Sequence, residues 1–494
     1  MSARVLGGVE VASDLVDAVA ESARRCPYRP ATVHNQVAMT YRELDMRIRA
    51  TARALGPSPG VVGVLTSRSP DTIVALLGVL TAGGTYCPID PGYPAERLHT
   101  MIAAAGIRTV LATGPMPAMP PDLALLRLPA DVALLRLPGD GPDPAPFAVI
   151  DTDAPAYLLF TSGSTGEPKP VITSRPAIAI ATSALGVLFG ITPQDRVLQF
   201  ASLSWDTCLE EILPTLTCAA TLVFDDEAYT GSFPRFLRML EREQITVLDL
   251  PTAFWHEFVR YLAESMATLS SSVRLMIIGG EAVDQARLDD WRALPTSHVR
   301  LLNTYGCTET TLITHAADLA DGDGIPIGLA LPHVREHLSS EGELLVGGAA
   351  IATGYLGRVG ETLTRFVDLP DGRYFRTGDK VRRGDDGELF HLGRLDHEVK
   401  IRGVRVDPAE VEAHLTQHPA VSAAAVTSVR RAGRTTMLGY VVADGDSDFR
   451  AWLRERVPEH LVPSRITVVP ELVRTASGKT NRAATHRRYP PTED

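Results

Sequence analysis

A chain of 494 residues is too long for one ordinary domain, and its content of 45% hydrophobic and 22% charged residues is typical of a soluble globular protein. The formal net charge of −11 argues against a nucleic-acid-binding protein, which usually presents a basic face, but it does not exclude a nucleotide substrate. The five cysteines lack C-x-x-C spacing, which favours reduced and mostly buried thiols. No apolar run is long enough to span a membrane and the first residues lack a signal-peptide core, so we expect a cytoplasmic protein that binds neither membranes nor nucleic acids.

The first third of the chain alternates between helix and strand patterns. Apolar periodicity predicts an amphipathic helix over 13–23, and Thr40 followed by Glu43 forms a capping box at the start of the next helix. This order of strands and helices indicates parallel sheets covered by helices. Short apolar runs predict strands at 61–65, 110–112, 125–128 and 157–160, with an apolar helix at 72–81. The string ALLRLP at 124–129 recurs at 133–138 and is interpreted as a local duplication.

The rest of the chain predicts three further units. A second doubly wound α/β unit is expected from strands at 197–200, 221–224, 246–250 and 275–278 and helices at 234–242 and 253–263. From Gly342 onward, short strands and glycine-rich turns predict a small β-rich subdomain. We therefore expect a large N-terminal domain over 1–393, a hinge at 394–396 and a small mobile C-terminal domain over 397–494.

The strand predicted at 157–160 leads into a loop of hydroxyl residues and glycines that ends at Lys169. Backbone N–H groups, hydroxyl donors and an ammonium group that converge in this way suit a polyphosphate, and glycines allow its oxygens to approach the backbone closely. The loop is not a Walker A motif, because the required spacing is absent and Pro168 precedes Lys169. The residues expected to bind phosphate are Thr161, Ser162, Gly163, Ser164, Thr165, Gly166 and Lys169.

This loop and further strings, in the same order along the chain, resemble a stand-alone adenylation domain of nonribosomal peptide synthetases, within the acyl-adenylate-forming superfamily. The matching strings lie at 80–90, 157–169, 303–309, 342–356, 374–379, 393–403 and 477–479. The resemblance implies an α/β fold with two doubly wound α/β subdomains and a small β-barrel-like subdomain, hinged to a small α+β C-terminal domain. It also implies ATP and Mg²⁺, a free amino acid as substrate, and formation of aminoacyl-AMP. No carrier-protein motif follows Lys479, so we expect transfer to the phosphopantetheine thiol of a separate carrier protein.

The resemblance also assigns roles to residues of the nucleotide site. Lys479 is the expected catalytic residue, which bridges the substrate carboxylate and the α-phosphate and stabilises charge at phosphorus. Asp396 falls at the hinge, and Glu309 is a hard oxygen ligand suited to Mg²⁺ held jointly with phosphates. Asp379 is expected to bind the ribose hydroxyls, with Arg394 on the ribose and phosphate side. The remaining nucleotide-binding positions are Asn303, Thr304, Tyr305, Gly306 and Thr308, of which Asn303 and Tyr305 offer an amide and an aromatic face to adenine.

Asp206 matches the carboxylate that pairs with the substrate's amino group, and it would select amino acids against plain carboxylic acids. The other pocket positions carried over by the resemblance are Thr207, Glu210, Asp249 (or Leu250), Ile277, Gly279, Thr304, Leu312 and Ile313. A buried glutamate is unfavourable unless it is paired, so Glu210 with Asp249 favours a basic substrate such as lysine, ornithine, arginine or β-lysine.

Several alternatives stay open at this point. Glu211 rather than Glu210 could face the ligand, and the substrate could be a small neutral or polar amino acid with an α- or a β-amine. An acyl- or aryl-CoA ligase of the same fold is a competing enzyme, and a non-catalytic module is a competing class. The set Lys169, Glu309, Asp379 and Lys479 argues against the latter.

Overall fold

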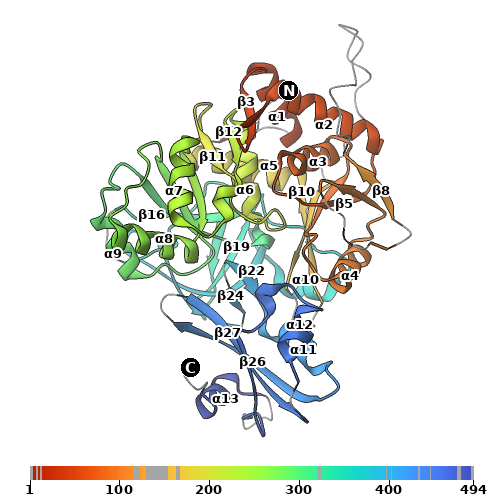
Figure 1. Cartoon of the computed structure of the whole chain (residues 1–494), viewed down its shortest axis with the longest axis vertical. Helices are drawn as coiled ribbons and strands as arrows, with labels where there is room; N and C mark the ends of the chain where they lie inside the picture. Colours follow the sequence, from red (N-terminus) through yellow and green to blue (C-terminus); the bar gives the residue numbers. More distant parts are fainter. Residues whose placement is uncertain are drawn as a thin grey trace.

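The computed structural model describes the chain except for residues 1–3, 7–8, 12–13, 115–116, 118, 121–122, 129–153, 163–166, 321–323, 397, 402, 432–433, 446, 475–479 and 491–494. A large domain occupies most of the molecule, and a small C-terminal domain lies below it (Figure 1). Within the described part of the chain, no helix has both the length and the apolar character that a membrane span requires. The second copy of the duplicated string, at 133–138, lies outside the described residues, whereas the first copy forms strand β8.

The first half of the large domain is built on a seven-stranded sheet of order β20-β10-β9-β6-β5-β7-β8. Its strands are β5 (Val61–Leu65), β6 (Thr85–Ile89), β7 (Thr109–Ala112), β8 (Ala124–Arg127), β9 (Pro155–Thr161), β10 (Lys169–Ser174) and β20 (Gly354–Tyr355). The central strands are parallel as predicted, but β9, β10 and β20 pair antiparallel. The connection from β9 to β10 is too short for a crossover, which is why these two strands form a hairpin.

The second half is a nine-stranded sheet of order β17-β16-β15-β14-β13-β11-β12-β3-β4. Its strands are β3 (Pro30–His34), β4 (Val37–Thr40), β11 (Arg196–Leu198), β12 (Thr221–Phe224), β13 (Val247–Pro251), β14 (Leu275–Gly279), β15 (Arg300–Gly306), β16 (Ile313–Asp318) and β17 (Leu329–Ala330). The N-terminal hairpin β3–β4 joins this sheet by parallel pairing of β3 with β12, a long-range contact that the sequence did not reveal.

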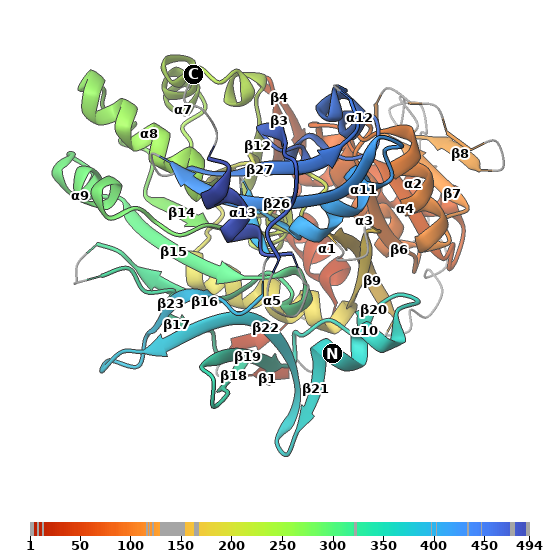
Figure 2. The same ribbon diagram turned by 90° about the horizontal axis from the view of Figure 1, so that it is seen from below.

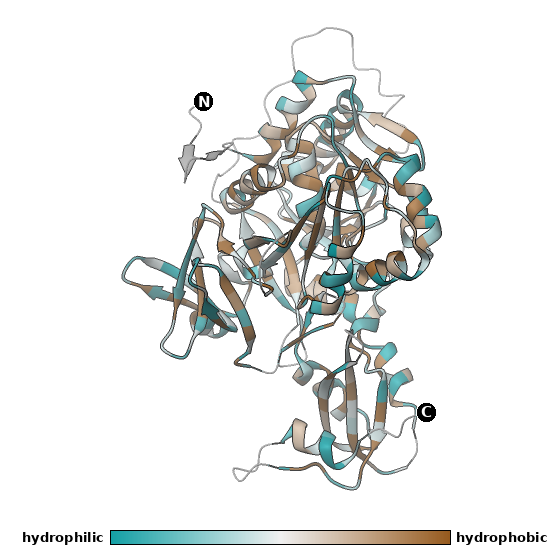
Figure 3. Ribbon diagram, turned by 90° about the vertical axis from the view of Figure 1, so that its left-hand side faces the viewer, coloured by the Kyte–Doolittle hydropathy of each residue, from teal (hydrophilic) through white to brown (hydrophobic). Residues whose placement is uncertain are grey.

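Helices pack between the two sheets and on their outer faces. The helices of the large domain are α1 (Leu15–Arg25), α2 (Tyr41–Leu55), α3 (Pro70–Thr81), α4 (Ala95–Ala105), α5 (Arg175–Phe189), α6 (Thr207–Thr217), α7 (Phe233–Arg242), α8 (Thr252–Ser265) and α9 (Gln285–Ala293). One cluster of buried side chains joins α3, α5 and α6 to strands of both sheets, and a second cluster covers the other face of the larger sheet under α7 and α8. Figure 3 shows this apolar interior along the central strands. The predicted capping box of Thr40 and Glu43 is confirmed at the start of α2.

The glycine-rich segment is β-rich, as predicted, and its strands form an antiparallel sheet. Its strands are β18 (Val334–Leu338), β19 (Glu343–Gly348), β21 (Phe366–Leu369), β22 (Gly372–Arg383) and β23 (Leu389–Arg394), with helix α10 (Val359–Arg365) beside them. The long strand β22 pairs with β19, β21 and β23. Its pairing with β23 places Asp379 opposite Arg394, the last residue of β23.

The small domain is α+β. It contains the hairpin β24 (Val399–Ile401) and β25 (Val404–Val406), a sheet of β26 (Val421–Arg431), β27 (Arg434–Ala443) and β28 (Arg465–Val468), and helices α11 (Pro408–Thr416), α12 (Phe449–Arg454) and α13 (Arg482–Arg488). A separate apolar core around Val411, Leu415 and Leu453 holds it together. The hairpin faces the large domain, whereas α13 lies on the outer side of the small domain, toward the viewer in Figure 2.

Candidate active site

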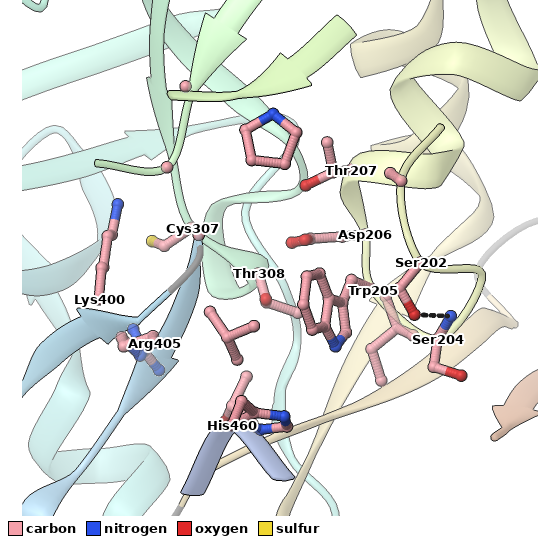
Figure 4. Close-up of a pocket in the computed structure, with 18 of the residues that line it drawn as sticks. Ser202, Ser204, Trp205, Asp206, Thr207, Cys307, Thr308, Lys400, Arg405 and His460 are labelled. Atoms are coloured by element: carbon pink, nitrogen blue, oxygen red, sulfur yellow. Dashed lines mark hydrogen bonds between the residues drawn. The ribbon is translucent and has the colours of Figure 1, made fainter. Parts of the chain in front are cut away.

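A cavity of about 330 Å³ lies where the large domain meets the small one (Figure 4). The large domain contributes the end of β9, the start of α6 and the carboxyl ends of β13, β14 and β15, while the small domain contributes the β24–β25 hairpin and the segment 458–461. Ligand sites at the carboxyl ends of neighbouring parallel strands are the rule in such sheets. The predicted residues that line this cavity are Thr161, Ser162, Asp206, Thr207, Glu210, Asp249, Gly279, Thr304, Gly306, Thr308, Leu312 and Ile313.

Asp206 stands immediately before α6 and points into the cavity beside Thr308 (Figure 4). Burial raises the pKa of Asp206, and the carboxylate of Glu309 raises it further, while a hydrogen bond from Thr308 and the charge of Arg405 oppose the rise. Such a carboxylate suits an ion pair with an amine, because the positive charge of the amine offsets the loss of hydration that disfavours the ionised carboxylate.

The neighbouring glutamates of α6 have different surroundings. Glu210 lines the cavity. Glu211 is buried and accepts hydrogen bonds from the backbone N–H groups of Phe200 and Ala201, both at 2.9 Å, and from Gln199 Nε2 at 3.0 Å. The predicted strand runs to Phe200, but β11 ends at Leu198: the Gln199 amide still bonds Val223 on β12, whereas the amides of Phe200 and Ala201 bond the Glu211 side chain instead of a strand. Glu210 is thus the glutamate that faces the cavity.

Asp249 on β13 lies close to Glu210 at the cavity wall. Among the residues that the structure describes, its Oδ2 is buried without a hydrogen-bond partner. Burial raises the pKa of Glu210 well above its ordinary value, and the charges of Asp249 and Asp206 raise it further. Burial likewise raises the pKa of Asp249. This part of the cavity is therefore an acidic recess.

The adjacent strands shape the rest of the recess. Ile277 pairs in register with Asp249 and packs in the core behind the cavity, not at its surface. No side chain fits at Gly279 without a shift of its neighbour, because a Cβ there would lie 2.6 Å from Thr304 Oγ1. Leu250 also borders the cavity, but its side chain belongs to the core on the other face of the sheet.

Strand β15 carries three neighbouring residues that were expected to bind the nucleotide, Asn303, Thr304 and Tyr305. Successive side chains of a strand point to opposite faces, so Thr304 faces the cavity while Asn303 and Tyr305 face away from it. The Tyr305 hydroxyl donates to Asp379 Oδ2 at 2.6 Å, and the Asn303 amide donates to the carbonyl of Pro326 at 2.7 Å. The structure thus brings Tyr305 and Asp379 together, whereas the amide of Asn303 is engaged by the backbone.

Asp379 on β22 is held from three sides. Besides Tyr305, Arg394 Nη1 and His391 Nε2 each lie 3.0 Å from its Oδ1. Burial raises the pKa of Asp379, but the hydrogen bond from His391 and the charge of Arg394 outweigh it and hold the pKa well below the ordinary value. His391 was missed by the sequence analysis, because a single histidine in a β-rich segment carries no signal of its own.

Glu309 belongs to a short 3-10 turn (Thr308–Thr310) and is completely buried. Its Oε1 accepts from Arg405 and from the hydroxyl of Tyr355 at 2.8 Å. Burial raises the pKa of Glu309, but Arg405 outweighs it and keeps the pKa below the ordinary value. Neither Arg405 nor Tyr355 could be predicted from the sequence as a partner of Glu309.

The surroundings of Glu309 fit the expected Mg²⁺. Its Oε2 is buried and has no hydrogen-bond partner among the described residues, so it is an oxygen that a hard cation can use. No group of three or more histidine, cysteine, aspartate or glutamate side chains in the described part of the chain could hold a metal alone. Phosphate oxygens and water would therefore have to complete the coordination, as they commonly do for Mg²⁺.

Two predicted elements of the phosphate and catalytic machinery lie partly outside the described residues. Gly163, Ser164, Thr165, Gly166 and Lys479 are among the residues that the structure does not describe. Lys169 is buried at the start of β10, with its ammonium 3.4 Å from Glu361 Oε2. It does not border the cavity.

The predicted hinge contains a network of charges. Arg394 Nε and Nη2 lie 2.6 and 2.7 Å from the two oxygens of Asp396, and Nη2 also lies 2.7 Å from Glu398 Oε2. Arg394 therefore joins the carboxylate of Asp379 to the segment that connects the two domains. Arg394 thus lies beside Asp379 and Asp396, while its role at the ribose and the hinge role of Asp396 stay predictions.

Comparison with known proteins places these features in a family. Residues 19–356 match the family model described as AMP-binding enzyme, and residues 410–479 match the AMP-binding enzyme C-terminal domain. The isonitrile lipopeptide synthase of Streptomyces coeruleorubidus is 40% identical over 473 residues, which are 92% of this chain and 32% of that protein. The chain thus spans about a third of the length of this relative.

Solved structures agree with the family match. Holo-PA1221, a nonribosomal peptide synthetase protein containing adenylation and PCP domains, bound to a vinylsulfonamide inhibitor, matches with a TM-score of 0.82 and 25% identity over 96% of this chain and 84% of that one. The amide bond synthetase McbA of Marinactinospora thermotolerans has the same fold, with a TM-score of 0.82 and 24% identity over 96% of this chain and 99% of that one.

Proposed function

Because the chain belongs to the AMP-binding enzyme family and is similar to adenylation domains of nonribosomal peptide synthetases, we propose that it activates a basic amino acid as an aminoacyl adenylate. Members of this family use ATP with Mg²⁺. The proposed substrates have side chains of the lysine, ornithine, arginine or β-lysine type. The second proposed step transfers the aminoacyl group to the phosphopantetheine thiol of a separate carrier protein, which the PCP domain named in the PA1221 structure supports.

The acidic recess is the observation that carries the basic substrate. Glu210 and Asp249 line the same cavity as Asp206, Asp249 is buried, and its Oδ2 has no hydrogen-bond partner among the described residues. Burying carboxylates close to each other is unfavourable unless a cation or shared proton relieves them. A substrate with two amines would satisfy both acidic positions, with one amine at Asp206 and the other at the Glu210–Asp249 pair.

The proposed chemistry assigns tasks to Asp379, Lys479 and Glu309. The substrate carboxylate attacks the α-phosphorus of ATP, an aminoacyl–AMP bond forms, and pyrophosphate leaves with the electrons of the broken bond. Asp379 would hold the ribose, and Lys479 would stabilise the charge that develops at phosphorus. Mg²⁺, when bound, supplies positive charge to the phosphates, and Glu309 is the residue that would hold it.

A second candidate is an acyl- or aryl-CoA ligase activity, or activation of a small neutral or β-amino acid. The equally high TM-score of an amide bond synthetase shows that this fold also occurs in a protein named for a different reaction. Asp206 argues against substrates that lack an amine, because leaving a desolvated carboxylate without its ion-pair partner costs about 3–5 kcal/mol.

Amino-acid-dependent ATP–pyrophosphate exchange would test the proposal, with the twenty standard amino acids, ornithine, β-lysine and free carboxylic acids as substrates. We expect strong exchange with a cationic amino acid, its loss in Glu210→Gln, and no exchange in Lys479→Ala. Glu227→Gln, which changes an exposed ion pair with Arg235, is the matched control and should keep full activity. Exchange with neutral amino acids alone would refute the acidic recess as the specificity element. Exchange only with acids that lack an amine would favour the ligase.

A further inference from the structure

The β24–β25 hairpin docks the small domain onto the phosphate-loop end of the large domain. The N–H of Gly403 donates to Glu281 Oε1 at 2.7 Å, and the N–H of Asp407 donates to Ser162 Oγ at 3.1 Å. The same Ser162 hydroxyl donates to the carbonyl of Arg405 at 2.9 Å. The amides of Gly403 and Asp407 are therefore hydrogen-bonded to the large domain when the domains are docked, and their hydrogen exchange measures docking.

Docking brings the guanidinium of Arg405 to the carboxylate that is expected to hold Mg²⁺. Arg405 extends from β25 toward the cavity (Figure 4), and its Nη2 forms an ion pair with Glu309 Oε1. The Glu309 side chain is completely buried, and the Arg405 side chain is 13% exposed. The guanidinium thus places a positive charge directly against Glu309 Oε1, and the Tyr355 hydroxyl is a neutral partner of the same oxygen.

The contact continues into the hinge. Arg405 Nε lies 3.4 Å from Glu398 Oε2, and the same oxygen lies 2.7 Å from Arg394 Nη2. Arg394 in turn binds Asp379. A chain of alternating charges thus runs from Glu309 through the small domain to the residue expected to bind ribose.

We propose that Arg405 and Mg²⁺ are competing counter-ions of Glu309, so that metal binding at Glu309 and the docked position of the β24–β25 hairpin weaken each other. A guanidinium and a divalent cation on one buried carboxylate would place like charges at contact distance in a site with little water to screen them. The proposal rests on the metal site of the proposed function but not on the identity of the acid. Arg405 is in this account a positioning residue that acts through Glu309.

Coupling between two binding events is reciprocal. Metal at Glu309 weakens docking, and docking weakens metal binding by the same factor. When Mg²⁺ departs with pyrophosphate, Arg405 can neutralise a carboxylate that would otherwise remain buried and charged. The ion pair thus makes docking of this hairpin sensitive to whether the metal is bound.

Hydrogen exchange at the amides of Gly403 and Asp407 tests the proposal on the full chain. Exchange is measured in EDTA, in EDTA with pyrophosphate, and in Mg²⁺ with pyrophosphate. Coupling of ordinary strength predicts that Mg²⁺ with pyrophosphate accelerates exchange at both amides roughly tenfold, while pyrophosphate in EDTA does not. Unchanged exchange in Mg²⁺ with pyrophosphate would overturn the proposal. This readout is independent of activity, so it separates failure of the inference from failure of the proposed substrate.

Variants sharpen the test. In Glu309→Gln the metal should have no effect on exchange at Gly403 and Asp407. Arg405→Ala should bind Mn²⁺, measured by the loss of the free-ion resonance signal in the presence of pyrophosphate, about 5–150-fold more tightly than the parent, and Arg405→Lys should stay close to the parent. Arg430→Ala, which removes a different contact between the domains, is the control and should keep the metal response. A metal response that persists in Glu309→Gln, or an unchanged Mn²⁺ affinity in Arg405→Ala, would refute the exchange of counter-ions.

Discussion

The hydroxyl of Tyr305 donates to Asp379 Oδ2 at 2.6 Å and so joins the ring expected to stack on adenine to the carboxylate expected to bind ribose. Tyr305→Phe keeps the ring and removes the hydroxyl. A hydrogen bond to a charged group contributes about 1.5–3 kcal/mol, so we expect KM for ATP to rise roughly tenfold or more. KM for the amino acid should stay unchanged, because Tyr305 lies on the face of β15 that points away from the cavity. Steady-state kinetics with each substrate varied in turn would check both values.

Tyr374 offers a matched control, because its hydroxyl also donates to an aspartate at 2.6 Å. That partner, Asp371, is exposed and belongs to a turn outside the cavity. Tyr374→Phe should leave both KM values unchanged. An equal rise of KM for ATP in the two variants would mean that loss of a tyrosine hydroxyl acts through general stability rather than through Asp379.

Binding of a cationic substrate should release protons. Burial raises the pKa values of Glu210 and Asp249 in the free protein, the charge of Asp249 raises that of Glu210 further, and an ammonium group favours the ionised forms of both. The affinity for lysine should therefore increase as the pH rises from the ordinary carboxyl range near about 4 toward the raised values. Calorimetric titration in buffers of different ionisation enthalpy measures the protons released.

Norleucine is the matched ligand for this titration, because it has the aliphatic chain of lysine without the terminal amine. It should bind with no proton release from the Glu210–Asp249 pair. A heat of lysine binding that does not depend on the buffer would contradict the acidic recess, as would an affinity that falls with rising pH.

The sequence predicted what depends on neighbouring residues and on motif order. The capping box of Thr40 and Glu43 is a local contact, and the structure confirms it. Period and turn chemistry likewise located most strands, and the family match confirms the overall α/β architecture. The motifs also placed Asp206 and Glu210 in one region, and the structure brings both to the cavity.

Contacts between distant segments were the ones that the sequence left unseen. Tyr355 and Arg405 reach Glu309 across 46 and 96 residues of chain, and the second contact depends on how the domains dock. The choice between Glu210 and Glu211 also required the structure, because neighbouring helix positions differ by only a fraction of a turn. The backbone amides that bind Glu211 become available only where β11 ends.

A buried ion pair across the domains should govern docking of α11. Arg97 Nη1 on α4 lies 2.7 Å from Glu410 Oε1 on α11, and both side chains are almost fully buried. Removing one partner of such a pair costs about 3–5 kcal/mol. Arg97→Met should therefore accelerate hydrogen exchange in α11 by two orders of magnitude or more.

The surface offers a pair of the same geometry as a control for Arg97. Arg24 Nη2 lies 2.7 Å from Glu21 Oε2 with both side chains more than half exposed. Exposed pairs contribute about 0–1 kcal/mol, so Arg24→Met should leave the melting temperature and the exchange in α11 nearly unchanged. The two variants differ in burial of the pair rather than in its length, so equal effects would disprove the role given to burial.

Glu210 and Glu211 allow the same substitution at adjacent positions with opposite expected results. Glu211→Ala leaves two backbone N–H groups and the Gln199 amide without their buried acceptor, and each loss costs about 1–3 kcal/mol. We expect a lower melting temperature by calorimetry. Glu210→Ala removes a carboxyl that must ionise against burial and against Asp249, so we expect an unchanged or higher melting temperature.

The pH dependence of Glu210→Ala follows from the raised pKa. An acid with a raised pKa in the folded state contributes its full stability while protonated, below the ordinary value near about 4, and loses it as the pH rises through the folded value. As the pH rises from about 4, the melting temperature of the parent should therefore decrease relative to that of Glu210→Ala. If the parent instead gains on the variant over this range, Glu210 is already paired with a cation of the protein, and the recess is not open to a basic substrate.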